Sequence, residues 1–181
     1  MTANELSSYP PLIAELIRQM PLAPLGPGSP VQGVRSKLDA VASAFPPGAD
    51  RDMSAACRAG LWLAFNFLDE SHKISQELVT AEGSYWHGIL HRREPDSSNA
   101  AYWFRRVGRH PLFATLAKEA LALGLRFPEG QWDAFYFVEL CEEHRGTGSE
   151  QEMLLRCVQQ REWELLFDRC FRRGRTQDAD G

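Results

Sequence analysis

Apolar residues recur at intervals of three and four along most of the chain, which is the spacing of an amphipathic helix. The first such run, Leu12 to Met20, follows Pro11, a residue that the first turn of a helix accepts. Pro21 to Gly33 is rich in proline and glycine, so we expect an extended connector without regular hydrogen bonding. A second helical stripe runs from Val34 to Phe45.

The segment from Met53 to Leu68 is apolar on nearly all sides, as expected of a helix surrounded by other helices. We therefore expect it to be the central helix. Polar side chains gather at its end: Asn66, Asp69, Glu70 and His72. If the helix continues, Asn66 and Glu70 share one face, and Asp69 and His72 share another. These groups either reach solvent or point into a polar cavity, because burying them without partners would be costly.

The rest of the chain predicts further helices whose boundaries carry chemical signals, such as Pro95 and the glycines 108, 124 and 174. The expected ranges are Glu82–Arg93, Ser98–Val107, Pro111–Leu123, Gln131–His144 and Glu150–Arg173, the last opened by Ser149 and Glu152 in capping-box spacing. No alternating run of β-branched residues predicts a strand. The pattern predicts an all-α, single-domain bundle of about seven or eight helices over residues 1–181, with a disordered tail at 175–181.

Composition narrows the range of functions. A hydrophobic content of 44% is ample for a continuous core, and a net charge of −4 disfavours binding to nucleic acid. The four cysteines (Cys57, Cys141, Cys157 and Cys170) lack metal-site spacing, which favours reduced thiols in the cytoplasm. The chain shows neither a signal peptide nor an apolar run long enough for a membrane span. We expect a cytoplasmic protein whose partner is a small polar or anionic molecule, with no membrane partner.

Two histidines provide the sharpest chemical signal. His87 and His91 lie four residues apart on one expected helix, so their imidazoles project from the same face, as in helical metal-binding pairs. Gly88 occupies the position where metalloproteases carry their general-base glutamate. A glycine inside a helix also suggests close approach of a neighbouring helix or a ligand. If a divalent metal binds, Glu70 or His72 is the best source of a third ligand beside the pair.

Arginine and aromatic side chains surround this pair in the sequence. Guanidinium groups suit carboxylates or phosphates, and aromatic rings provide faces for sugars or cations. The candidate ligand-binding residues are Tyr85, Trp86, Arg92, Arg93, Asn99, Trp103, Arg105 and Arg106. Ion pairing with nearby acidic residues is the structural alternative for the arginines, and helix capping is the alternative for Asn99. We expect His110 and His144 to be structural.

The stretch from Asp69 to Pro111 contains four blocks, DESH, EGSYWHGILHRREPD, SNA and YWFRRVG, the last followed by HP. These blocks resemble a family of uncharacterised helical proteins from bacteria and fungi. The resemblance covers about the middle quarter of the chain and implies a shared site in this region. It implies no activity, cofactor or substrate, and no catalytic residue is carried over from it.

Three classes of function are compatible with these features. The first is a small-molecule site, either a binding site or an active site. In it, His87, His91 and Glu70 supply acid/base groups, and the arginines hold an anionic or sugar-like compound. The second is a divalent metal site, and the third is an interaction module with an Arg/Trp patch. No glycine-rich phosphate loop is present, so lyase, isomerase or hydrolase chemistry fits better than redox or nucleotide chemistry.

Overall fold

The protein is all-α, as a computed structural model that describes residues 6–175 shows, and no strand occurs among these residues. The α-helices are α2 (Pro11–Gln19), α3 (Arg35–Ala40), α4 (Arg51–Ala64), α5 (Leu68–Ser75), α6 (Ala81–Arg93), α7 (Ser97–Val107), α8 (Leu112–Leu123), α9 (Ala134–His144) and α10 (Glu150–Arg175). Two short 3-10 turns cover Val41–Ala44 and Pro128–Gly130. The expected class is confirmed, but the described residues form nine α-helices rather than seven or eight.

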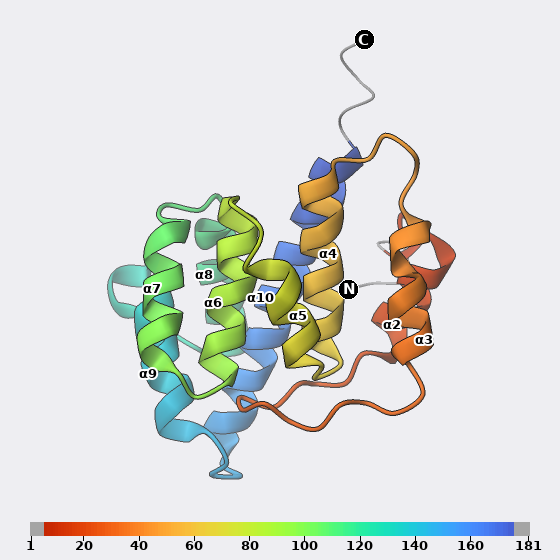
Figure 1. Ribbon diagram of the computed structural model, residues 1–181. Helices are drawn as coiled ribbons and strands as arrows, with labels where there is room; N and C mark the ends of the chain where they lie inside the picture. The colour runs from red at the N-terminus through yellow and green to blue at the C-terminus, as the bar shows by residue number, and fades with distance from the viewer. Residues whose placement is uncertain (1–5, 176–181) are drawn as a thin grey trace.

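The longest helix, α10, runs through the molecule and packs against α4, α8 and α9, while α6 packs against α4, α5 and α7 (Figure 1). Tryptophans join these helices in the core. The Trp163 indole on α10 donates a hydrogen bond of 2.7 Å to the carbonyl of Gly60 on α4. A Cβ atom at Gly60 would lie 2.7 Å from the Trp86 ring of α6, so only glycine admits this contact. The expected central helix therefore shares the centre with α10.

The expected helix from Met53 to Leu68 is wrong at its end. Helix α4 stops at Ala64, and Asn66 adopts a left-handed backbone with φ of 64°, a conformation that asparagine tolerates better than most residues. The chain then turns and starts a separate helix, α5, at Leu68. Glu70 and His72 consequently belong to a different helix from Asn66, and Asn66 and Glu70 do not share a helix face.

Other boundaries differ less. The run from Val34 to Phe45 forms α3 followed by a 3-10 turn, and α9 begins at Ala134 rather than Gln131 because Asp133 caps it. Helix α10 continues through Gly174, so Arg175, which was expected in the tail, is helical. Residues 176–181 of the expected disordered tail lie outside the described residues. No helix between residues 6 and 175 has both the length and the apolar character to cross a bilayer.

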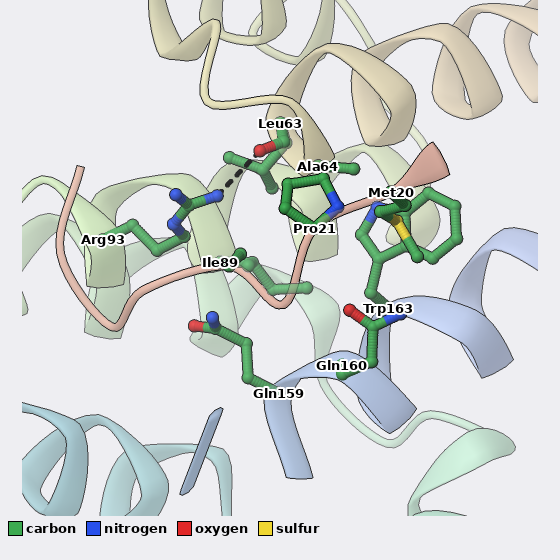
Figure 2. A pocket seen from close by; sticks show the side chains of 10 residues that line it. Met20, Pro21, Leu63, Ala64, Ile89, Arg93, Gln159, Gln160 and Trp163 are labelled. Atoms are coloured by element: carbon green, nitrogen blue, oxygen red, sulfur yellow. Dashed lines mark hydrogen bonds between the residues drawn. The ribbon is translucent and has the colours of Figure 1, made fainter. Parts of the chain in front are cut away.

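The connector between α2 and α3 is irregular, as expected, and the buried side chain of Arg93 holds it in place. The guanidinium donates hydrogen bonds to the carbonyls of Leu63 at 2.7 Å, Gly26 at 3.1 Å and Pro27 at 3.0 Å. Figure 2 shows Arg93 and Pro21 of the connector among the residues that line a small cavity, whose volume is about 20 Å³. That volume holds about one water molecule, so the cavity is no substrate site.

Candidate metal centre

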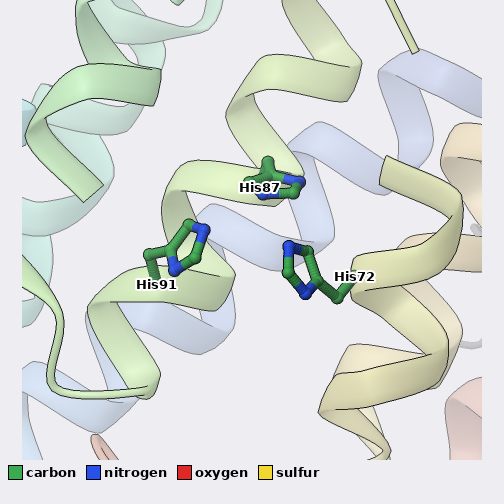
Figure 3. Close-up of side chains that lie close together, drawn as sticks. All are labelled: His72, His87 and His91. Atoms are coloured by element: carbon green, nitrogen blue, oxygen red, sulfur yellow. The ribbon is translucent and has the colours of Figure 1, made fainter. Parts of the chain in front are cut away.

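Three imidazoles from two helices meet at one point of the structure. His72 comes from α5, and His87 and His91 come from α6. One ring nitrogen from each lies within 4.8 Å of the others, and the ring centroids are 4.6 to 5.4 Å apart. Figure 3 shows the three rings arranged around a common centre. Of the two third groups that the sequence offered, Glu70 and His72, the fold brings His72 to the pair.

Local structure explains how α5 and α6 reach this arrangement. Thr80 caps α6, its hydroxyl accepting a hydrogen bond of 3.1 Å from the amide of Gly83. A Cβ atom at Gly83 would lie 2.3 Å from the Cβ of Leu78, so only glycine lets the connection from α5 pass this close to α6. This tight connection sets the position of His72 relative to the pair on α6.

Polar groups lie beside the Nδ1 atoms of two of the rings. The Ser75 hydroxyl lies 2.8 Å from Nδ1 of His87 and donates its proton to the carbonyl of His72 at 3.4 Å. When the hydroxyl proton is given to that carbonyl, the Ser75 oxygen accepts from His87 Nδ1–H, and Nε2 of that ring is the unprotonated nitrogen. A carboxylate oxygen of Glu94 lies 3.1 Å from Nδ1 of His91. Such partners on one nitrogen are typical of imidazoles that bind a metal through the other.

The environment keeps the two imidazoles of α6 neutral. His87 is 1% exposed and His91 is 7% exposed. Burial, reinforced by the neighbouring His91 and His72, lowers the pKa of His87 to about 3. Burial and His72 also lower the pKa of His91, although Glu94 opposes this shift. Neutral imidazole is the form that binds metal ions.

Helix α7 forms one wall of the cluster. The Trp103 ring lies 4.1 Å from the His87 ring between centroids, and the Arg106 guanidinium lies 5.2 Å from the Trp103 ring. A Cβ atom at Gly88 would lie 3.0 Å from the Phe104 ring, so this glycine permits the close approach of α7. Because His72 is only partly buried, the cluster is not sealed from solvent.

Several candidate residues lie elsewhere. Glu70, considered as a ligand and a base, pairs with Arg35 and is absent from the cluster of ligand atoms. The fully buried guanidinium of Arg92 pairs with Glu162, at 3.3 Å between Nη1 and Oε1, and stacks on Phe137. Together with the contacts of Arg93 described above, these contacts show that both guanidinium groups are buried and bonded to protein groups.

Most of the remaining candidate residues either have structural roles or lie near the histidine cluster. Tyr85 and Trp86 have no exposed surface and pack in the aromatic core. The amide of Asn99 binds the Asp96 carboxylate at 2.7 Å, and Asp96 caps α7, so this group serves the helix end. Arg105 is exposed. Of the eight proposed ligand-binding residues, Trp103 contacts the histidine cluster directly and Arg106 reaches it through Trp103.

Sequence reasoning missed the orienting role of Ser75. Its position three residues after His72 places both on one face of α5, which is the signal that could have found it. His110 and His144 lie outside the cluster, and His110 Nε2 is 3.8 Å from the buried carboxylate of Glu82.

Comparison of the chain with models of protein families, with curated proteins and with solved structures produced no match. The resemblance noted for residues 69–111 therefore stays a prediction.

Proposed function

We propose that the protein binds a divalent transition metal through His72, His87 and His91. The observation that carries the proposal is the meeting of three imidazoles from two helices, with ligand atoms within 4.8 Å of one another. A bound metal would draw the rings slightly closer together, since metal to imidazole nitrogen distances are about 2.0 to 2.1 Å. The hydrogen bond between Ser75 and His87 and the proximity of Glu94 to His91 support the same proposal.

The donor set narrows the choice of metal. Imidazole nitrogen suits zinc, copper, nickel and iron, whereas magnesium and calcium prefer oxygen ligands. Three protein ligands leave a coordination position for water or substrate, which is the arrangement of catalytic rather than structural zinc sites. The chemistry best supported is therefore activation of water or polarisation of a carbonyl in a small molecule that enters beside His72.

The two alternative functions have less support. Acid/base catalysis without a metal requires a group whose pKa lies near the working pH, and that of His87 is about 3. An interaction module needs an exposed aromatic patch, but Trp86 is buried and Trp103 is partly buried against His87, so Tyr102 alone of these three rings is exposed.

Metal analysis of protein purified without an affinity tag tests the proposal. We expect about one equivalent of a transition metal, and after its removal we expect one equivalent of Co²⁺ to bind and produce a visible absorption spectrum. His87→Ala and His72→Gln should each abolish this binding. His144→Ala, which removes a histidine outside the cluster, is the matched control and should bind Co²⁺ as the parent protein does.

Two cluster variants are used because His87→Ala changes a buried residue and could impair folding. His72 is only partly buried, so His72→Gln leaves the core intact. Circular dichroism checks that each variant is folded. Folded parent protein that binds neither Co²⁺ nor Zn²⁺ at micromolar concentrations would overturn the proposal, and so would equal binding by His72→Gln.

A further inference from the structure

A second site lies on the α8 side of the molecule. A cleft of about 540 Å³ is bounded by α8 and by the residues just before α9. Its lining includes Arg109, Phe113, Lys118, Gln131 and Trp132. None of its lining residues belongs to the histidine cluster. Its volume falls in the range of about 300 to 1,000 Å³ that is usual for small-molecule sites.

The charges of this cleft have one sign. Arg109 and Lys118 are both exposed, and neither forms an ion pair within the described residues. No carboxylate lines this cleft, although Glu129 and Asp133 line an adjoining one. Two unpaired cations on the wall of one concave surface attract an anion.

Besides its positive charges, the cleft has an apolar wall of aromatic residues. Phe113 and Trp132 supply flat apolar surface to both clefts. Trp132 is only 5% exposed, yet its indole N–H lacks a hydrogen-bond partner in the described part of the chain. Other buried polar atoms of the described residues, such as the Trp86 indole N–H, also lack a partner, so the rings and cations of the cleft carry the inference, and the Trp132 N–H adds to it.

His110 limits what the cleft can do. Its Nδ1 accepts a hydrogen bond of 3.4 Å from the amide of Leu112, and its Nε2 faces Glu82 at 3.8 Å. Both ring nitrogens are thus directed at the protein rather than at a ligand. The cleft offers cations and rings but no free acid or base, which favours binding without catalysis.

We propose that this cleft binds a small organic anion that carries a flat aromatic ring. Arg109 and Lys118 hold the anionic group, and the ring packs against Phe113 and Trp132. The site is independent of the metal centre, so each proposal can fail without the other.

Two matched dyes test this inference. 8-Anilinonaphthalene-1-sulfonate carries the required anion and rings, and N-phenyl-1-naphthylamine has the same rings without the sulfonate. Fluorescence titration of the full chain should show one sulfonate dye bound per protein, at least tenfold more tightly than the neutral dye. In the ¹H–¹⁵N spectrum, the dye should shift the indole signal that Trp132→Phe removes.

Charge variants locate the site. Arg109→Gln combined with Lys118→Gln should weaken binding of the sulfonate dye at least tenfold and leave the neutral dye unaffected. Arg18→Gln combined with Arg105→Gln removes the same charge from exposed positions outside the cleft and should change neither affinity. Equal weakening by both pairs, equal affinity for the two dyes, or no stoichiometric binding would each overturn the proposal.

Discussion

Helix α6 carries two sets of buried polar residues that differ in how their hydrogen-bonding groups are used. Arg92 and Arg93 are each 1% exposed, and their guanidinium groups meet a carboxylate, an amide oxygen and main-chain carbonyls. His87 and His91 are nearly as buried, but in each ring only Nδ1 faces a hydrogen-bonding group of the described residues. Burial alone therefore does not separate structural from functional polar residues; the partners that each buried group meets must be considered as well.

The largest expected effect is a loss of folding stability on replacing Arg92. Arg92→Met leaves Glu162 buried without its cation, and breaking such a pair costs about 3 to 5 kcal/mol. Urea unfolding measures the loss. Arg92→Met combined with Glu162→Leu should recover most of the stability, because no unpaired charge is then buried. A double variant as unstable as the single one would contradict a structural role for the pair alone.

Glu82, in the first turn of α6, is another buried charged residue with a structural role. Burial alone would raise its pKa, but His110, a backbone amide and Arg173 together lower it from 4.5 to about 2. As pH falls from about 5 to 2, the unfolded chain therefore binds a proton before the folded protein does, and about 3 kcal/mol of stability is lost. Unfolding measured across this range should show a smaller loss for Glu82→Gln. An identical pH response in both proteins would refute the assignment.

Ser75 tests the histidine side of the comparison. Ser75→Ala removes the hydroxyl that is hydrogen-bonded to Nδ1 of His87, and loss of such an outer partner typically lowers metal affinity about 10- to 100-fold. The stability of the metal-free protein should change by only about 1 kcal/mol. Titration with Co²⁺ measures the affinity. Ser43→Ala removes an exposed serine that also bonds to the main chain and should leave the affinity unchanged.

The smallest effect is expected at the surface of α7. Arg105 is exposed and forms no ion pair within the described residues, so Arg105→Gln should change unfolding free energy by less than about 0.5 kcal/mol. Its Co²⁺ affinity should equal that of the parent protein. A marked fall in that affinity would extend the candidate site across α7.

Particular residues show which features of the fold and site could be predicted from the sequence. The pairing of His87 with His91 follows from their spacing on one helix, and the boundaries of α6 were predicted to within one residue. The choice between Glu70 and His72 as a third group could not be made, because it depends on the left-handed turn at Asn66 and on the direction in which α5 leaves it. For Arg92 and Arg93, the sequence could not separate ligand contacts from structural bonds. Their hydrogen-bond partners lie about 30 to 70 residues away along the chain.

By itself, the sequence determined the all-α class, most helix boundaries and the shared face of His87 and His91, since these depend on local periodicity and on capping residues. Only the tertiary structure decided that His72 completes the cluster and that Arg92 and Arg93 belong to the core. The physical reason is that such groupings depend on how helices pack and on which distant group meets each buried polar atom. Contacts of this kind leave no regular spacing along the chain.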